Sequence, residues 1–330
     1  GWTRSRWCLP LVVLGLVMGG PVAAKFCGDD VGGRDVACAC GDVLVSDLKL
    51  TDDPIARQTC PHDGLVVRAD DVGAAIEIDL AGRTLRGTGA GVGLRVLSGG
   101  PGGARIVSRG GPAALEGFDD GIAGRGADSV ALVQDVVIRG SRRDGLRLTG
   151  RQYVMRRITV DGAGRDGFAL GGAGFEVTDT RALDCRRYGY FVMGDSGVIG
   201  GDGAGNIAER SGTAGFNFMG AGHTLVACRA NGGRKDGVAL HAVGMDVRGC
   251  EARDNGGDGI AGVGGRVRLQ DNTALDNGGD GLRLRGPGLI DAGGNRHTHA
   301  ERQGHQEHDI EASKSNLKYA NTPLREESSG

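Results

Sequence analysis

Short stretches of alternating apolar and polar residues run along most of the chain, and they recur at a nearly constant interval. Asp144-Gly145-Leu146-Arg147-Leu148 shows the pattern, in which an Asp-Gly turn precedes two apolar residues separated by a polar one. The glycines of seven such segments fall at positions 145, 167, 189, 215, 237, 259 and 281, so the gaps between them are 22, 22, 26, 22, 22 and 22 residues. Alternation by two predicts short strands, and this interval predicts one coil of a solenoid per unit.

The phase of the alternation separates core positions from surface positions. Because successive side chains of a strand point to opposite faces, Leu146 and Leu148 are expected to point into the solenoid and Arg147 to point outward. By the same phase, the predicted core includes Phe168, Phe216, Phe218, Ile260 and Leu282. Coils stacked about 4.8 Å apart would pair their strands in parallel and bury a continuous apolar column.

These repeated Asp-Gly turns and alternating strands make the chain similar to the right-handed parallel β-helix repeat proteins. This pectate lyase-like superfamily includes pectate lyases, polygalacturonases and alginate epimerases. The segment from Asp79 to Gly87 also resembles the first coils of uncharacterised secreted bacterial members. The resemblance covers about residues 41 to 292 and implies an all-β, right-handed parallel β-helix of about ten coils with a Cys-rich N-terminal cap. It leaves the function to be argued from the side chains on the coils.

Composition excludes two other classes of protein. Glycine accounts for 65 of the 330 residues, but there is no strict glycine at every third position and only 8 prolines, so a collagen-like triple helix is excluded. The formal net charge of -2 provides no electrostatic argument for a nucleic-acid partner.

The first 24 residues are predicted to be a signal peptide. Arg4 and Arg6 precede an apolar run from Leu9 to Met18, and small residues from Val22 to Ala24 offer a cleavage site. An uncleaved N-terminal anchor is the alternative. The prediction places the mature protein in a secreted, periplasmic or cell-surface location, with no membrane span once the signal is removed.

Three segments follow the signal in this interpretation: a Cys-rich cap at 25–64, the β-helix at 65–292 and a polar tail at 293–330. The tail contains His297, His299, His305 and His308, a composition that can bind metal ions. Its charged, polar character favours an extension without regular structure.

Six cysteines are candidates for disulfides. Cys27, Cys38, Cys40 and Cys60 cluster in the cap, where export permits disulfides and three pairings remain open. Zinc ligation is the rival interpretation, although the spacing lacks paired Cys-x-x-Cys units. Cys228 and Cys250 are one 22-residue interval apart, so they could form a disulfide between stacked coils or remain as two buried thiols.

The outward positions two residues after the repeat glycines are candidates for substrate binding. This column contains Arg147, Phe191, Asn217 and Arg283. An aromatic ring there could stack on a sugar, and the guanidinium groups could pair with uronate carboxylates. The column contains no carboxylate, so it does not supply the two acids of a paired-carboxylate hydrolase.

A second candidate set would suit a polysaccharide lyase or a uronate epimerase. Removing a proton next to a uronate carboxylate needs a base, an acid and a cation that neutralises the carboxylate. His241, Tyr188, Arg187 and Lys235 have the required side chains, and we interpret them as the candidate catalytic residues.

A third candidate set is a column of carboxylates before the repeat glycines, formed by Asp236, Asp258 and Asp280. Carboxylates on stacked coils repel one another unless solvent, arginine or a divalent cation compensates them. Calcium is therefore the ion that this column would hold, although ordinary Asp-Gly turns need no ligand. No cofactor is required by any other pattern in the chain.

Two functions follow as expectations. The first is binding, and in second place processing, of an acidic polysaccharide along the solenoid surface. The alternative is a non-catalytic structural or adhesin-like envelope protein. The alanine-rich outward column favours this alternative or a form of the first function that binds without processing.

Overall fold

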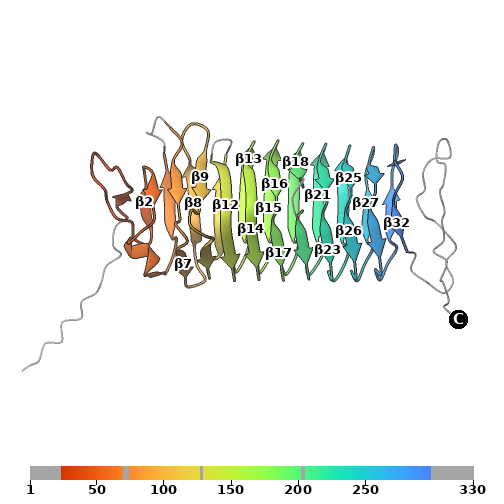
Figure 1. Ribbon diagram of the computed structural model, residues 1–330, viewed down its shortest axis with the longest axis horizontal. Helices are drawn as coiled ribbons and strands as arrows, with labels where there is room; N and C mark the ends of the chain where they lie inside the picture. Colours follow the sequence, from red (N-terminus) through yellow and green to blue (C-terminus); the bar gives the residue numbers. More distant parts are fainter. Residues whose placement is uncertain (1–23, 70–73, 127–128, 202–204, 299–330) are drawn as a thin grey trace, which may run out of the picture.

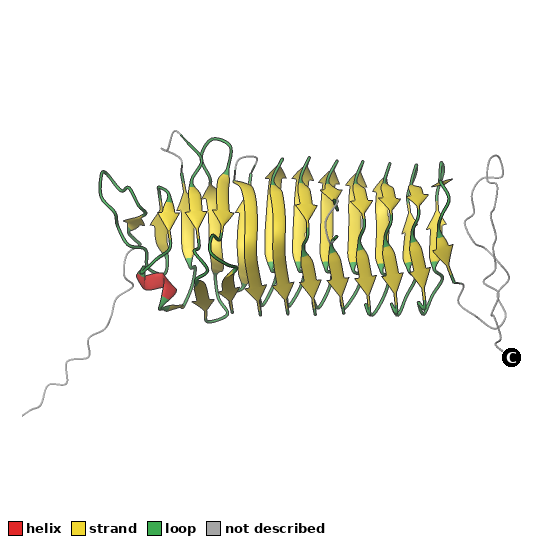
Figure 2. Cartoon of the chain, viewed as in Figure 1, coloured by secondary structure: helices red, strands yellow, loops and turns green. Residues whose placement is uncertain are grey.

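The computed structural model describes residues 24–69, 74–126, 129–201 and 205–298. The predicted signal peptide, apart from Ala24, and the tail histidines His299, His305 and His308 lie outside these residues. The described chain consists of short strands joined by turns and loops, with one short 3-10 helix, η1 (Pro54–Ala56), near the N-terminal end (Figure 2). Among the described residues no helix has the length and apolar character needed to cross a membrane.

The strands stack in chain order into a parallel solenoid of about 11 turns (Figure 1). Most coils contribute three strands, one to each of three parallel ladders. The first ladder is a 12-stranded sheet, here called sheet 1, formed by β1 (Phe26–Cys27), β2 (Asp42–Leu44), β5 (Leu65–Arg68), β8 (Val92–Ser98), β11 (Asp120–Arg125), β13 (Leu146–Arg151), β15 (Phe168–Ala173), β18 (Tyr190–Asp195), β21 (Phe216–Ala221), β24 (Val238–Val243), β27 (Ile260–Val263) and β30 (Leu282–Arg285).

The other two ladders form one 20-stranded sheet, here called sheet 2, because β12 (Val130–Arg139) and β14 (Val154–Asp161) run through both. One ladder contains β3 (Leu48–Lys49), β6 (Glu77–Asp79), β9 (Ala104–Val107), β16 (Glu176–Thr178), β19 (Val198–Ile199), β22 (Thr224–Val226), β25 (Asp246–Arg248), β28 (Arg268–Gln270) and β31 (Ile290–Asp291). The other contains β4 (Thr59–Cys60), β7 (Thr84–Gly87), β10 (Ala113–Glu116), β17 (Arg181–Leu183), β20 (Ile207–Glu209), β23 (Arg229–Asn231), β26 (Glu251–Arg253), β29 (Thr273–Leu275) and β32 (Arg296–His297).

Left-handed residues mark the corners between the strands. In the column that separates the two ladders of sheet 2, the backbone φ lies between 50° and 79° at Asp135, Arg157, Asp179, Gly205, Ala227, Gly249 and Asp271. These positions keep the interval of the repeat, including its single 26-residue step. The longer coil therefore places its extra residues at this corner, between β19 and β20, and the register of the strands is unchanged.

The interior confirms the phase predicted from the alternation. Phe168, Tyr190 and Phe216 lie at successive paired positions of sheet 1, and their rings stack with centroids 4.7 and 4.5 Å apart. The other predicted core residues, Leu146, Leu148, Phe218, Ile260 and Leu282, are also buried. This stack of large apolar side chains is the continuous core that single coils could not form.

The cap contains two disulfides, Cys27–Cys38 and Cys40–Cys60, which select one of the three pairings that the sequence left open. Strand pairing already begins inside the cap, because β2 pairs with β1 and with β5. At the other end, pairing continues as far as β32, which pairs with β29.

The candidate disulfide between Cys228 and Cys250 is not formed, and both residues are buried free cysteines. The sulfur of Cys250 is directed at backbone groups: it accepts a hydrogen bond from the Cys228 amide at 3.4 Å and lies 3.7 Å from the carbonyl oxygen of Arg248. Burial is the main factor that raises the pKa of the Cys228 thiol well above its usual range. Cys228 and Cys250 are therefore two buried thiols, the second of the two alternatives expected from the sequence, and they do not cross-link the coils.

Candidate functional site

Buried carboxylates and arginines of the following coil form a ladder along one edge of sheet 1. Asp144 and Asp166 have no exposed side-chain surface, and each accepts bidentate hydrogen bonds from the arginine 21 residues later, Arg165 and Arg187. The Nε–Oδ1 distance is 2.7 Å in both pairs. These hydrogen bonds are the main factor that raises the pKa of each of the two guanidinium groups.

A second arginine position serves the same carboxylates. Arg147 lies three residues after Asp144 and donates to Asp120 of the preceding coil, with an Nη2–Oδ2 distance of 2.6 Å. Arg283 repeats this arrangement near the C-terminal end, where its Nε lies 2.6 Å from Oδ2 of Asp258. A carboxylate of this column can therefore be paired by an arginine from either of two positions in the next coil.

The ladder is interrupted at Asp236. In the coil that follows Asp236, the two positions that hold arginine in the paired coils are occupied by Gly257 and Ala261, so neither position supplies a cation. The Asp236 carboxylate accepts a hydrogen bond from the backbone amide of Asp258 at 2.9 Å and forms no ion pair with the described residues. Lys235 also forms no ion pair with the described residues, because Ala214 occupies the position in the preceding coil where a column carboxylate would stand.

A pocket of about 170 Å³ lies where the ladder is interrupted. Its lining residues are Asp236, Ala239, His241, Ala261, Gly262, Val263, Arg283 and Arg285. They come from β24, β27 and β30 and from the turn before β24. The small side chains at 239, 261 and 262 leave the space, while the charged and polar groups stand around it.

The pocket therefore contains one carboxylate, one imidazole and two guanidinium groups. Arg283 is engaged with Asp258, whereas Arg285 is exposed and forms no ion pair with the described residues. His241 is also exposed. Asp236 and His241 could hold or transfer a proton, and Arg285 could bind an anionic group.

An aromatic cluster lies on the same sheet two coils before His241. The rings of Tyr188 and Phe191 stack with centroids 5.4 Å apart, and both are half-buried. The guanidinium carbon of Arg187 lies 5.0 Å from the Tyr188 ring centroid and 5.2 Å from that of Phe191. Because Asp166 holds Arg187 in place, the cluster is a fixed platform with apolar faces and a cation beside them.

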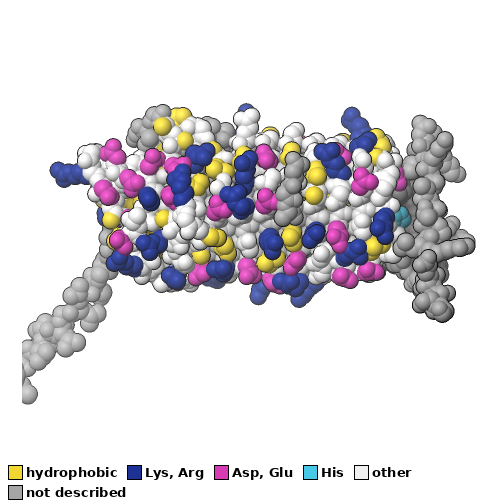
Figure 3. All heavy atoms as spheres, viewed as in Figure 1, with side chains coloured by type: hydrophobic (Ala, Val, Ile, Leu, Met, Phe, Trp, Pro, Cys, Tyr) yellow, Lys and Arg dark blue, Asp and Glu magenta, His cyan; other side chains and the backbone are white. Residues whose placement is uncertain are grey.

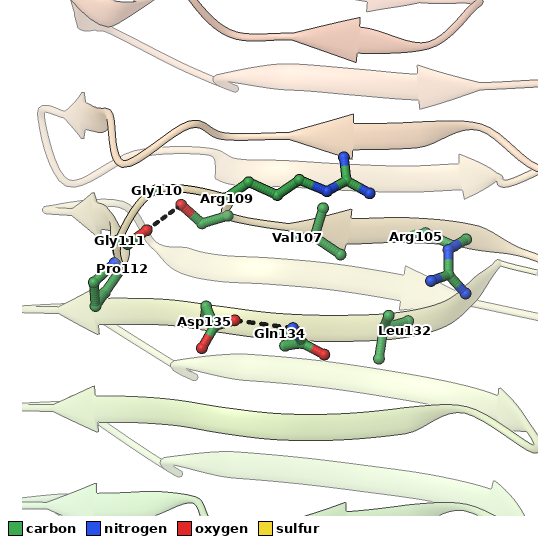
Figure 4. Close-up of a pocket in the computed structure, with 10 residues that line it drawn as sticks. Arg105, Val107, Arg109, Gly110, Gly111, Pro112, Leu132, Gln134 and Asp135 are labelled. Carbon is green, nitrogen blue, oxygen red and sulfur yellow. Dashed lines mark hydrogen bonds between the residues drawn. The ribbon is translucent and has the colours of Figure 1, made fainter.

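A second pocket, of about 510 Å³, lies on sheet 2 between the loop after β9 and strand β12 (Figure 4). Its charged residues already have partners: Arg105 and Arg109 pair with Glu77, and Asp135 pairs with Arg157. The visible face of the molecule likewise shows cationic and anionic side chains interspersed, without a large area of one sign (Figure 3). Of the two pockets, the one on sheet 1 is therefore the one with charged side chains that form no ion pair with the described residues.

Residues 120–286 match the family model described as the right handed beta helix region. This chain belongs to the right-handed β-helix family. The chain matches no curated protein sequence.

Three solved β-helix structures are similar in fold. The mannuronan C-5 epimerase A-module of Azotobacter vinelandii is 15% identical, with 75% of this chain and 78% of that chain covered and a TM-score of 0.45. The Dettilon tailspike protein is 13% identical, with 79% and 62% covered and a TM-score of 0.33. The catalytic domain of a GH87 alpha-1,3-glucanase in complex with nigerose is 12% identical, with 84% and 69% covered and a TM-score of 0.35. Likeness at this level concerns the fold alone.

Within this β-helix, the pocket unites residues that the sequence analysis assigned to three separate sites. His241 was a catalytic candidate, Arg283 a substrate-binding candidate and Asp236 a metal candidate, and all three line one pocket. Tyr188 and Arg187 belong instead to the aromatic cluster with Phe191. Lys235 is exposed beside Asp236 but does not line the pocket.

Other candidates have different surroundings from those expected. Asn217 is only 3% exposed although its register partners are Phe191 and Ala239 on the outward column, so little of its side chain is accessible to a substrate. Arg147 is engaged by Asp120 and Asp144. Asp258 is neutralised by Arg283, and the described residues contain no group of three His, Cys, Asp or Glu side chains that could hold a metal ion.

Arg285 is the pocket residue that sequence reasoning missed. It follows Arg283 by two residues on β30, so it shares the outward phase that selected Arg283. Its importance depends on the lack of a carboxylate partner, which the alternation of one strand does not reveal.

Proposed function

We propose that this protein binds an acidic polysaccharide along the outer face of sheet 1. The observation that carries the proposal is the pocket on this face, where Arg285 is exposed and forms no ion pair with the described residues, with Lys235 likewise free of an ion pair to them beside Asp236. An unpaired guanidinium beside a pocket is suited to a carboxylate of the ligand, because charge-assisted bidentate pairs are strong and directional.

The repeat of the solenoid suits a polymer better than a small ligand. Equivalent side chains on successive coils recur about every 4.8 Å, close to the length of one sugar residue. The Tyr188–Phe191 platform lies about two such steps from His241, so one chain could contact both places. Apolar ring faces would stack on a sugar ring while Arg285 binds a uronate carboxylate.

Proton transfer in the pocket is a second candidate function, favoured by the presence of Asp236 and His241 beside Arg283 and Arg285. This set could remove a proton next to a uronate carboxylate that an arginine neutralises, as a lyase or an epimerase requires. Asp236 is the single carboxylate among the lining residues, so the pocket does not favour a paired-carboxylate hydrolase.

The location that fits this function is outside the cytoplasm. The two disulfides of the cap support it, because such bonds persist in oxidising compartments. We infer that the protein is secreted, periplasmic or exposed at the cell surface, where acidic polysaccharides are available.

The test is a binding panel of pectate, alginate and a neutral glycan with the purified protein. We expect binding to the two uronate polymers that weakens with added salt, and Arg285→Ala should reduce the affinity roughly tenfold, or about 1.4 kcal/mol. Arg181→Ala is the matched control, since Arg181 is an exposed arginine on sheet 2 with no ion pair to the described residues. Equal binding to neutral glycans, or no binding at all, would contradict the proposal and favour a structural or adhesin-like protein.

The same samples distinguish binding from processing. Unsaturated uronate ends would show a lyase, and a change in the C5 configuration of the polymer, followed by nuclear magnetic resonance, would show an epimerase. Activity that disappears in both Asp236→Asn and His241→Gln would assign the chemistry to the pocket. An unchanged polymer after prolonged incubation would leave binding as the function.

A further inference from the structure

Two exposed methionines and a histidine occupy one column of sheet 1. Met193 on β18 is the register partner of Met219 on β21, and Met219 is the register partner of His241 on β24. Met193 and Met219 are 47% and 41% exposed, and His241 is exposed as well. All three side chains are on the outward phase of their strands, so they stand on the same face in three consecutive coils.

The exposure of these methionines is not explained by packing. The other two methionines among the described residues, Met155 and Met245, are at most 1% exposed and fill the core. The register partner of Met193 in the coil before it is Gly171, so the thioethers in this column are confined to the two coils that precede the coil of the histidine. His241 is also the only histidine among the described strands of sheet 1.

We propose that Met193, Met219 and His241 form a binding site for a soft monovalent metal ion, with Cu(I) as the physiological candidate. Thioether sulfur is a soft, polarisable donor that selects Cu(I) over hard cations, and imidazole also binds copper. The set contains no carboxylate or thiolate, so it is unsuited to calcium and lacks the usual ligands of a structural zinc site.

The spacing of the coils permits the three donors to meet. Neighbouring strands lie about 4.8 Å apart, so Met219 is the central donor and the other two approach from about that distance on either side. A methionine side chain has three rotatable bonds, which lets each sulfur lean over the middle strand. His241 is exposed and is the register partner of Met219, so its imidazole can turn toward the neighbouring strand.

The experiment uses Ag(I), a redox-stable probe for Cu(I), and the full chain with ¹³C-labelled methionine methyl groups. We expect one Ag(I) to bind and to shift the methyl signals of Met193 and Met219, leaving those of buried Met155 and Met245 in place. The double variant Met193→Leu/Met219→Leu should lose roughly tenfold or more in affinity, and His241→Ala should also weaken binding. The Leu substitutions conserve volume on an exposed surface, so the fold should persist.

Met245→Leu is the matched control, because it removes a thioether from the core and should leave Ag(I) binding unchanged. Binding that survives in the double methionine variant would assign the ion to another group, such as the thiols of Cys228 and Cys250, and would overturn the proposal. An absence of shifts at Met193 and Met219 would overturn it as well. The double variant leaves Arg285, His241 and the Tyr188–Phe191 platform in place, so alginate binding measured without Ag(I) is a separate readout from the metal result.

Discussion

Two regions of sheet 1 use the same backbone for different purposes. In the coils of β11 to β18, here called the paired region, the column carboxylates are buried and each is bound by an arginine of the next coil. In the coils of β24 to β30, here called the open region, Asp236 has no such partner and Arg285 and Lys235 remain free of ion pairs with the described residues. The open region also contains the pocket.

The difference comes from two small residues rather than from a change of fold. Gly257 and Ala261 occupy positions where the paired region has Arg187 and Arg147 or their equivalents, so the coils remain in register while a charge is left uncompensated. The pocket therefore arises from small side chains in an unchanged register, without new loops or a new strand.

The largest expected effect distinguishes the two regions by stability. Asp144→Asn should lower the free energy of unfolding by about 1–3 kcal/mol, because it weakens the buried hydrogen bonds from Arg165 and the ion pair with Arg147, whose own charges remain partly solvated. Asp236→Asn should change it by no more than about 0.5 kcal/mol, since the amide oxygen can still accept from the Asp258 backbone. Thermal unfolding followed by circular dichroism measures both, and similar losses would contradict the division into two regions.

The second prediction converts the open region into a paired one. Ala261→Arg places a guanidinium where Arg283 stands one coil later, so it should pair with Asp236 and fill the pocket. We expect uronate affinity to fall roughly tenfold, or about 1.4 kcal/mol, with stability unchanged or slightly raised. Thr224→Arg, which adds an arginine at an outward position of β22 on sheet 2, is the control and should leave glycan affinity near that of the wild type. Retained affinity in Ala261→Arg would show that the pocket is not part of the glycan site.

The third prediction concerns His223, which lies in the core between the two regions. Its Nδ1 accepts from the Gly197 amide at 3.1 Å, and burial is the main factor that lowers its pKa. The unfolded chain therefore binds more protons than the folded one, so stability should be constant above about pH 6.5 and fall below it, by at most about 1.4 kcal/mol per pH unit. Unfolding midpoints between pH 5 and 8 test this. His223→Gln should lose this component of the pH dependence, whereas His241→Gln should retain it.

The smallest expected effect is that of a chelator. Arg283 already neutralises Asp258, and the described residues contain no group of three metal ligands of the His, Cys, Asp or Glu type. We therefore expect EDTA to leave both the unfolding temperature and uronate binding unchanged. A loss of either that calcium restores would return the Asp236, Asp258 and Asp280 column to consideration as a calcium site.

The candidate site was predictable only in part. Asp236, His241 and Arg283 each carried a recognisable signal, but the sequence analysis placed them in three different sites because their mutual distances follow from the stacking of three coils. Asn217 had the outward phase and is nevertheless buried, since exposure depends on the side chains of neighbouring coils as well as on the phase. Phase along one strand does not contain that information.

The sequence by itself determined the solenoid, its core and its interval. These features are properties of residue order: alternation by two selects the inward side chains, and the constant 22-residue step brings like residues into register. Only the tertiary structure decided which charges remain available and that Cys228 and Cys250 stay as thiols. The reason is that the ion pairing and the exposure of a side chain depend on residues of the neighbouring coils. The glycine at position 257 therefore leaves a carboxylate without an arginine partner, which can be seen only once the coils are stacked.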